Sequence, residues 1–241
     1  SGGIDSGILN LIASKKLKNI KSFTCGFDLS SASGIEMNFD ERKKAEELSN
    51  ICKTNHIEIV LKAGDMEKSL KRLNYILDEP RIGQSYPNFY IANLASKFVK
   101  VVLSGVGGDE LFGGYPWRYY HGVGDENLDE YLENYFKFWQ KILNLNELSK
   151  ILSPLKSELK DYSIKDELKN VFKPYYNNEI EINNKSNLSL YFESKTFLNG
   201  LLLVEDRISM SNGMETRLPF LENDLVKFAQ KIPIKFKIKN L

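Results

Sequence analysis

The first hundred residues alternate between segments with apolar side chains at helical spacing and short apolar runs. Ile8, Leu9 and Ile12, for example, recur at intervals that place them on one side of a helix. The pattern predicts helices over residues 6–18, 39–53, 66–77 and 87–98, and strands over residues 20–27, 56–61 and 99–103. The last of these runs is typical of a buried strand. Such alternation predicts an α/β fold, with a parallel sheet covered by helices on both faces.

After residue 120 the strand pattern fades. Apolar spacing there predicts helices over residues 129–143, 165–171 and 188–203, and the polar segment 175–187 indicates a surface loop. Near the end, apolar residues alternate with Lys235, Lys237 and Lys239, which predicts a strand-like tail with lysines facing solvent. We therefore expect an α/β core over residues 1–120 and a mostly helical section over residues 121–241.

Composition narrows the possible classes of protein. Hydrophobic residues make up 42% of the chain and the net charge is +1, so neither nucleic acid nor an anionic membrane is expected as a main partner. No apolar run approaches the roughly 20 residues of a membrane-spanning helix, and the first residues do not resemble a secretory leader. Cys25 and Cys52 are then expected to be reduced thiols in a cytoplasmic protein. His56 and His121 are isolated, so no zinc site is expected.

Two glycine-rich segments each stand in front of a predicted helix. Residues 1–6 read Ser-Gly-Gly-Ile-Asp-Ser, and residues 104–110 read Ser-Gly-Val-Gly-Gly-Asp-Glu. Small residues let backbone amides approach an anion, and the start of a helix favours phosphate. A carboxylate beside phosphates is explained by a magnesium ion between them. One such loop is as easily an ordinary glycine turn, but two with the same chemistry favour a nucleotide site. The Gly-Lys-Ser or Gly-Lys-Thr pattern of Walker loops is absent.

Residues 1–6 resemble the pyrophosphate loop of the N-type ATP pyrophosphatases, a motif shared by several enzyme families. The block at residues 103–115, Leu-Ser-Gly-Val-Gly-Gly-Asp-Glu-Leu-Phe-Gly-Gly-Tyr, is more specific and resembles the signature of the asparagine synthetase family. Residues 206–221 match the same family, and shorter similarities lie at residues 24–27, 40–41 and 78–80. The resemblance covers nearly the whole chain, least well from about residue 122 to 187, and implies a Rossmann-like fold.

This resemblance implies an ATP-dependent ligase that amidates aspartate. The side-chain carboxylate of aspartate would attack ATP to give β-aspartyl-AMP and pyrophosphate, and ammonia would then displace AMP. The implied cofactors are ATP and Mg²⁺. In the family, ammonia comes from glutamine through a glutaminase domain that is expected upstream of Ser1, as is the strand that leads into Ser1. We therefore expect the chain to be part of a longer protein, for which a homodimer is one option.

The resemblance also assigns roles to individual residues. Those expected to hold the ATP phosphates are Ser1, Gly2, Gly3 and Ser6. Those expected to contact the rest of the nucleotide are Cys25, through its backbone, Ser104 and Gly105. Asp5 and Asp109 would share the magnesium ion. Asp109 and Glu110 are the candidate catalytic residues, although capping of the next helix is an equally good role for Glu110.

Other positions allow different interpretations. Arg207, Glu215 and Arg217 are predicted to form a buried ion-pair framework, and the cluster at residues 115–120 is either a pocket wall or a hydrophobic hinge.

Val106 is apolar where well-studied relatives often carry an acidic residue. This leaves two alternatives: an adenylating enzyme with another acceptor, such as a β-lactam synthetase-like enzyme or another amidotransferase, or an inactive nucleotide-binding domain. No residue of the chain is assigned to the adenylation lysine of the family.

Overall fold

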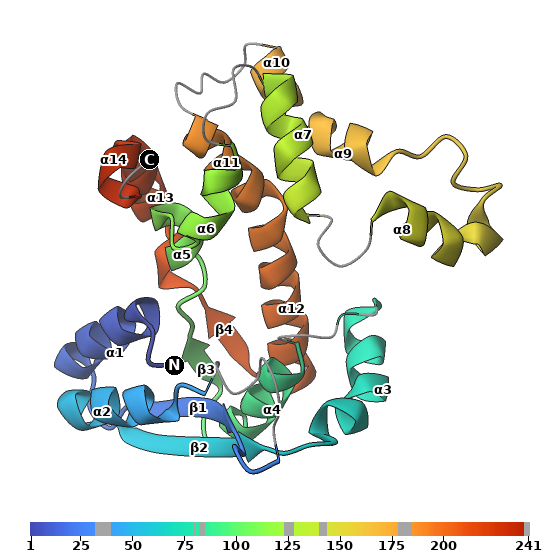
Figure 1. Ribbon diagram of the computed structural model, residues 1–241. Helices are drawn as coiled ribbons and strands as arrows, with labels where there is room; N and C mark the ends of the chain where they lie inside the picture. Colours follow the sequence, from blue (N-terminus) through green and yellow to red (C-terminus); the bar gives the residue numbers. More distant parts are fainter. Residues whose placement is uncertain are drawn as a thin grey trace. The chain divides into compact units, whose positions relative to one another are not determined.

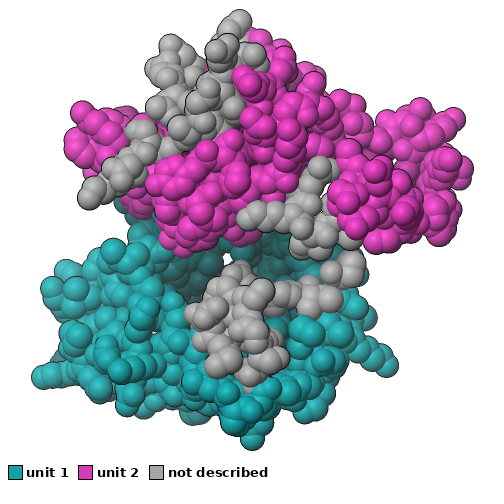
Figure 2. Space-filling model, in the orientation of Figure 1, with its two compact units in different colours: residues 1–108, 200–225 teal, residues 109–199, 226–241 magenta. Residues whose placement is uncertain are grey.

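The computed structural model describes residues 1–31, 40–79, 81, 85–122, 128–139, 144–177 and 185–238. The chain forms two compact units, which Figure 2 shows in different colours. Unit 1 comprises Ser1–Gly108 and Gly200–Leu225, and unit 2 comprises Asp109–Asn199 and Val226–Leu241. The predicted division at residue 120 between a core and a helical section stays a prediction.

Unit 1 contains the alternating helices and strands that the sequence predicts (Figure 1). They are α1 (Ile4–Lys16), β1 (Lys21–Phe27), α2 (Arg42–Cys52), β2 (Asn55–Leu61), α3 (Asp65–Leu77), α4 (Ser85–Ala95) and β3 (Val101–Leu103). The chain re-enters this unit within α12 (Phe197–Ser211) and continues through β4 (Glu215–Arg217), the 3-10 turn η4 (Pro219–Leu221) and the first residues of α13 (Asn223–Lys231). The seven predicted elements are confirmed, with ends that shift by a few residues.

The strands of unit 1 pair in parallel, as predicted. β1 pairs with β2 from Lys21 opposite Asn55 to Phe27 opposite Leu61, and β3 pairs with β4, an element that the apolar pattern misses. Among the described residues these ladders form two separate two-stranded sheets. The prediction that residues 99–103 form a buried strand is wrong, because β3 has a described partner on one side only and Val101 and Leu103 are exposed.

The core of unit 1 lies between β1, β2 and the helices beside them. α2 and α4 both pack against the two strands, while α1 packs on α2 and α3 on α4. Leu73 and Leu77, one helical turn apart on α3, are fully buried. They join Phe27 and Leu61 at the ends of the strands, together with Ile208 from α12. The late segment 200–225 therefore contributes to the core of the α/β part.

Within its described residues, the regular elements of unit 2 are all helices, joined by turns (Figure 1). Its elements are α5 (Gly108–Phe112, from Asp109 on), α6 (Pro116–Tyr119), η2 (Tyr120–Gly122), α7 (Leu128–Trp139), α8 (Leu145–Ile151), η3 (Ser153–Leu155), α9 (Ile164–Val171), α10 (Lys173–Tyr176), α11 (Lys185–Lys195), the first turn of α12, the end of α13 and α14 (Ile234–Lys237). An aromatic cluster forms its core, with Tyr131, Tyr135 and Phe172 fully buried. The prediction of a mostly helical section is confirmed.

The helical prediction for residues 188–203 is confirmed by α11 and α12, which are separated at Thr196. The prediction for the end of the chain is wrong. The tail is a helical turn: Ile238 N donates to Ile234 O at 2.9 Å, and Lys237 is half-buried with a pKa lowered by that burial. Apolar residues at every second position of the tail predict a strand. The structure instead follows the spacing of four between Ile234 and Ile238, which is typical of a helix.

Some predictions include residues that the structure does not describe. Those residues are Lys239, Leu143, Pro80 and residues 178–184, which make up most of the predicted loop. Within the described part of the chain, no helix combines the length and the apolar character that crossing a membrane requires.

Candidate functional site

The first glycine-rich loop leads directly into α1. Gly3 is the residue that caps the helix, and it has no side chain with which to satisfy the first amides. Ser1 Oγ accepts from Gly3 N at 3.3 Å and donates to Ser6 Oγ at 3.0 Å, so the two predicted serines lie together. Asp5 is in the first turn of the helix. Backbone amides, two hydroxyls and a carboxylate at one helix start suit an anion that carries a metal ion.

Close packing explains Gly2, the first glycine of this loop. A Cβ atom at Gly2 would overlap Lys44 Cβ, because the loop backbone lies directly on α2. One turn further along, a Cβ atom at Gly7 would have ordinary contact with Leu48 at 3.7 Å. Of these two glycines, only Gly2 is required by the space available.

The second loop continues from β3 and is fixed by its own backbone. Ser104 N donates to Arg217 O at 3.0 Å, which extends the pairing with β4 by one bond, and Gly108 N donates to Gly105 O at 3.2 Å. Gly107 has a φ of +102° and lies so close to η4 that a Cβ atom would be 2.5 Å from Leu221 Cδ2. A glycine is needed here for both conformation and space.

The two loops meet at Asp5. A Cβ atom at Gly105 would lie 2.9 Å from Asp5 Cβ and 3.1 Å from Ser6 N, and one at Gly108 would lie 2.5 Å from Asp5 Oδ1. The carboxylate of Asp5 thus rests against the backbone of the second loop. Segments about a hundred residues apart therefore place their small residues around one carboxylate, as the interpretation of a nucleotide site requires.

Asp109 and Glu110 belong to unit 2, so the predicted sharing of a metal ion between Asp5 and Asp109 stays a prediction. Within unit 2, the backbone carbonyl of Asp109 accepts from Gly113 N at 2.9 Å and from Gly114 N at 2.8 Å. A Cβ atom at Gly114 would lie 2.5 Å from Asp109 Cγ. The Gly-Gly pair of the signature therefore lets the chain fold back over the aspartate.

Glu110 is buried, with 3% of its surface exposed, and Tyr115 OH donates to its Oε1 at 2.9 Å. Burial first, and the neighbouring Glu110 second, raise the pKa of Tyr115. The Arg118 guanidinium lies 4.2 Å from the centre of the Tyr115 ring and 4.1 Å from that of Phe197. The cluster at residues 115–120 is therefore tied to Glu110 through a buried network.

The network ends at a fully buried carboxylate. Arg118 Nη1 lies 2.8 Å from Glu193 Oε2, and Tyr135 OH donates to Glu193 Oε1 at 2.7 Å. Burial raises the pKa of Glu193, although both partners favour its charged form. Glu193 was not predicted from the sequence. The available signal was a glutamate within the apolar stretch of a predicted helix.

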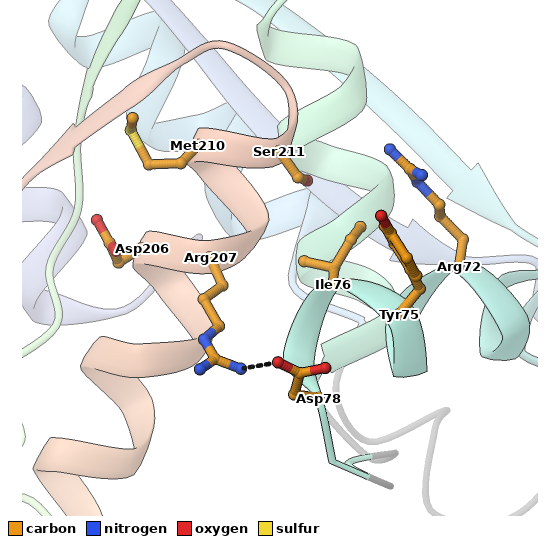
Figure 3. A pocket seen from close by; sticks show the side chains of 8 residues that line it. All are labelled: Arg72, Tyr75, Ile76, Asp78, Asp206, Arg207, Met210 and Ser211. Carbon is orange, nitrogen blue, oxygen red and sulfur yellow. Dashed lines mark ion pairs between the residues drawn. The ribbon is translucent and has the colours of Figure 1, made fainter.

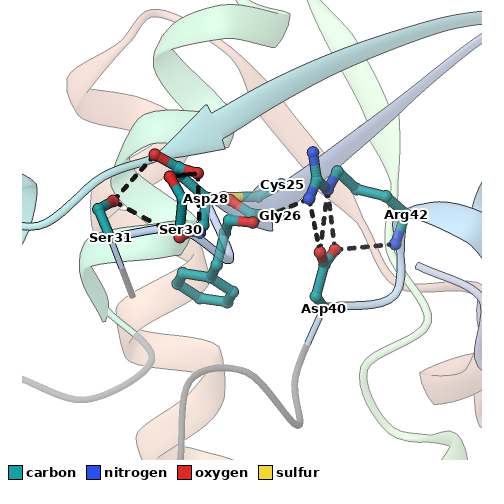
Figure 4. A network of polar contacts seen from close by, with 8 residues as sticks. Cys25, Gly26, Asp28, Ser30, Ser31, Asp40 and Arg42 are labelled. Atoms are coloured by element: carbon teal, nitrogen blue, oxygen red, sulfur yellow. Dashed lines mark hydrogen bonds and ion pairs between the residues drawn. The ribbon is translucent and has the colours of Figure 1, made fainter. Parts of the chain in front are cut away.

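Cys25 lies in β1, where burial and, to a lesser degree, Asp40 raise the pKa of its thiol to about 12. Figure 4 shows the polar network next to it. Arg42 pairs with Asp40 at 2.7 Å and donates to Phe27 O at 2.8 Å. A Cβ atom at Gly26 would lie 2.5 Å from Arg42 Cγ, so this glycine lets the arginine lie across the end of the strand. The contact of Cys25 with adenine stays a prediction.

The predicted ion-pair framework forms in part and is not buried. Arg217 Nε lies 2.8 Å from Glu215 Oε1, but both side chains are more than half exposed, and Arg217 lowers the pKa of Glu215. Arg207 instead donates to Leu77 O, where it caps the end of α3. It also borders an open groove of about 580 Å³ (Figure 3), whose other lining residues are Arg72, Tyr75, Ile76, Asp78, Asp206, Met210 and Ser211.

Glu205, on α12, is a second carboxylate that was not predicted from the sequence. Burial raises the pKa of its carboxyl group, and the Ser104 hydroxyl group opposes this shift to a smaller degree. Four apolar residues, 201–204, precede it. A carboxylate directly after such a run is an uncommon choice for a helix that packs in a core, and this was the signal in the sequence.

Comparison with known proteins agrees with this arrangement. The family model for asparagine synthase matches residues 1–241. The asparagine synthetase [glutamine-hydrolyzing] 1 of Bacillus subtilis is 27% identical, over all of this chain and 41% of its own length. A putative asparagine synthetase of Mycobacterium bovis is 28% identical over 99% of this chain and 39% of its own length. One from Methanocaldococcus jannaschii is 35% identical over 48% of this chain. The chain thus spans about two fifths of the length of the first two relatives.

Proposed function

The chain belongs to the asparagine synthase family, and from that premise we propose that it forms asparagine from aspartate through an adenylated intermediate. The side-chain carboxylate of aspartate attacks the α-phosphorus of ATP, and pyrophosphate leaves. Ammonia then attacks the carbonyl carbon of β-aspartyl-AMP, and AMP departs with the electron pair of the broken C–O bond. Ammonia comes from glutamine, hydrolysed by a domain in the part of the protein that this chain does not span.

The observation that carries the proposal is the meeting of both glycine-rich loops at Asp5 in unit 1. The backbone amides at the start of α1, with the hydroxyls of Ser1 and Ser6, suit the phosphate groups of ATP and then the leaving pyrophosphate. Gly105 and Gly108 bring the second loop close enough to enclose the same anion. Such a site acts by positioning its substrates and by balancing charge.

The donor set fits magnesium. This ion is commonly held by one or two carboxylates together with phosphate oxygens, so a cage of protein ligands is not needed. Asp5 lies beside the predicted phosphate site, and Asp109 is the second proposed ligand. When bound, Mg²⁺ would offset the charge of the phosphates. Within the described residues, no group of three or more His, Cys, Asp or Glu side chains is placed to hold a metal ion.

Further parts of the proposal concern the sheet of unit 1, the contact with adenine, the location of the protein and its assembly. We propose that the two parallel strand pairs of unit 1 belong to one Rossmann-like sheet, at whose carboxyl edge both loops lie. The backbone at Cys25 would then face the adenine, and Ser104 would line the nucleotide pocket. A cytoplasmic location and a homodimer remain predictions.

The test uses the full-length protein with ATP, magnesium and either glutamine or ammonia, and measures AMP, ADP and pyrophosphate with and without aspartate. We expect AMP and pyrophosphate in equal amounts and only when aspartate is present. Formation of ADP would reject the adenylation mechanism. AMP formed with a different carboxylate, and not with aspartate, would favour the alternative acceptor that Val106 leaves open.

The aspartates are tested by pyrophosphate exchange into ATP. Asp5→Asn and Asp109→Asn should each lower the exchange rate by about 10²–10³-fold, because each removes a charge at the phosphates. Asp161→Asn is the matched control, since Asp161 is exposed in unit 2. Normal exchange by Asp109→Asn would show that its assignment to the metal is wrong.

A further inference from the structure

The helix that carries Asp109 is too short to fix its own direction. α5 spans the five residues Gly108–Phe112, and helices shorter than about 12 residues are marginal on their own. Where the chain turns back, Gly113 N and Gly114 N donate to the carbonyl of Asp109. The direction of the Asp109 carboxylate therefore depends on contacts that α5 makes with the rest of unit 2.

Glu110, the next residue on α5, makes such a contact. It is 3% exposed, and Tyr115 OH donates to its Oε1 at 2.9 Å. Neighbouring side chains on a helix point about 100° apart, so Glu110 faces inward while Asp109 stays partly exposed. With so little accessible surface, the Glu110 carboxylate is better placed to hold α5 than to meet a substrate.

Arg118 holds the tyrosine in turn. Its guanidinium group lies 4.2 Å from the centre of the Tyr115 ring and 4.1 Å from that of Phe197, in the first turn of α12. The two rings meet edge to face with their centres 5.8 Å apart. A planar guanidinium stacks well on aromatic faces. Arg118 thus restricts the ring whose hydroxyl group reaches Glu110.

Glu193 fixes Arg118 from α11, the helix on which α6 packs (Figure 1). Arg118 Nη1 lies 2.8 Å from Glu193 Oε2, and Tyr135 OH donates to Oε1 at 2.7 Å, so both carboxylate oxygens have a partner. Apolar residues of the same volume are often as stable as a buried ion pair. Stability is therefore a weak explanation for this pair, and the direction that it imposes on Arg118 is a better one.

We propose that Arg118 is a positioning residue for the nucleotide site: held by Glu193, it fixes Tyr115 and, through Glu110, the helix that presents Asp109. The inference rests on the proposed function, in which Asp109 is a ligand of the magnesium ion. Arg118 acts through α5 and is assigned no contact with the reacting atoms. Glu110 is then a support for Asp109.

The experiment compares Tyr115→Phe, Arg118→Met and Arg118→Met/Glu193→Leu in the full-length protein. The readouts are pyrophosphate exchange into ATP, the Mg²⁺ concentration at half-maximal exchange and the thermal midpoint. The double variant should regain much of the midpoint that Arg118→Met loses, because no unpaired charge remains. Its exchange rate should nevertheless stay about 10²-fold below that of the wild type, because Tyr115 is no longer held. Tyr115→Phe should lower the rate by about tenfold.

Both classes of variant should need more Mg²⁺ for half-maximal exchange, which a purely structural role would not require. Arg118→Lys keeps a cation beside Glu193 and loses the planar face, so it should lose exchange activity while largely keeping its midpoint. Arg72→Met is the matched control: Arg72 lies 5.6 Å from the centre of the Tyr75 ring at an exposed position of α3, and its loss should change no readout.

Two outcomes would overturn the proposal. One is a double variant whose exchange rate recovers together with its thermal midpoint, since the ion pair would then serve stability alone. The other is wild-type exchange by Tyr115→Phe, since the hydroxyl group would then hold nothing that the reaction needs. Tyr115→Phe decides the question by itself if the double variant does not fold.

Hydrogen–deuterium exchange without nucleotide or metal keeps this inference distinct from the proposed function. The amides of Gly113 and Gly114 donate to Asp109 O, so their exchange rates report how firmly α5 is held. They should exchange at least about tenfold faster in Tyr115→Phe and in the double variant than in the wild type or Arg72→Met. Absence of AMP formation with aspartate would reject the proposed function and leave this measurement intact. Unchanged amide exchange would overturn the positioning role by itself.

Discussion

The carboxylate of Asp5 lies against the backbone of Gly108, with room for a hydrogen atom and not for a methyl group. A Cβ atom at Gly108 would be 2.5 Å from Asp5 Oδ1, a separation that real atoms of this kind do not adopt. The residue 103 positions earlier in the chain therefore requires glycine at position 108. This relationship allows the position of the carboxylate to be tested without changing the carboxylate itself.

Gly108→Ala should move Asp5 and lower kcat/KM for ATP by about 10²-fold, since a displacement of about 1 Å in an active site has that effect. Steady-state formation of pyrophosphate measures it. Gly7→Ala is the matched control: its Cβ atom would have ordinary contact with Leu48, and its amide already donates to Gly3 O. Equal losses in the two variants would show that the contact between Asp5 and the second loop does not matter.

Gly114→Ala tests Asp109 in the same way within unit 2. Its Cβ atom would lie 2.5 Å from Asp109 Cγ, so the aspartate must move, and the exchange of pyrophosphate into ATP should fall by about 10²-fold. In an Asp109→Ala background the added methyl group has no carboxylate to displace. The two substitutions should therefore be far from additive, and a full further loss on adding Gly114→Ala would contradict this account.

Breaking the ion pair of Arg118 and Glu193 should destabilise unit 2 strongly. Arg118→Met leaves Glu193 buried and without its cation, and should lower the free energy of unfolding by about 3–5 kcal/mol. Urea unfolding followed by circular dichroism measures the change. Adding Glu193→Leu to Arg118→Met should restore much of the loss, because no unpaired charge then remains. A double variant less stable than Arg118→Met would show that the network stabilises beyond this pair.

Glu205 should make stability depend on pH. Burial raises the pKa of its carboxyl group above the unfolded value of about 4.3, so the folded protein retains the proton to higher pH. Its contribution is therefore most favourable below that value and is lost as pH rises through the folded pKa. Glu205→Gln should have a thermal midpoint close to that of the wild type near pH 4 and a higher one at pH 7. A difference that does not change with pH would contradict the assignment.

Cys25 should react slowly with alkylating reagents. With a pKa of about 12, its thiolate is scarce at pH 8, and iodoacetamide should modify it at least about 100-fold more slowly in the folded protein than in urea. Mass spectrometry of peptides distinguishes Cys25 from Cys52. Modification of Cys25 at the same rate in both conditions would show that the end of β1 is open.

Local order was largely predictable from the sequence. The helices and strands of residues 4–103 follow from apolar spacing, which appears in the chain even for α1 and β3, where the structure leaves many of the apolar side chains exposed. The prediction for the tail was wrong because apolar spacing does not distinguish a helix from a strand in a very short segment. In so short a segment, Ile234 and Ile238 satisfy a helical spacing while the intervening Phe236 also satisfies a strand pattern, and packing decided between them.

The sequence by itself determined which residue types stand in the two loops, and with them the family and the expectation of a phosphate site. Two loops with the same chemistry favour that site, because backbone amides at the start of a helix can bind an anion through neighbours in the chain alone. Tertiary structure alone decided that Asp5 meets Gly108 and that Arg118 pairs with Glu193. Each of these contacts joins positions 75 or more residues apart, and only the packing of distant helices and loops brings such positions together.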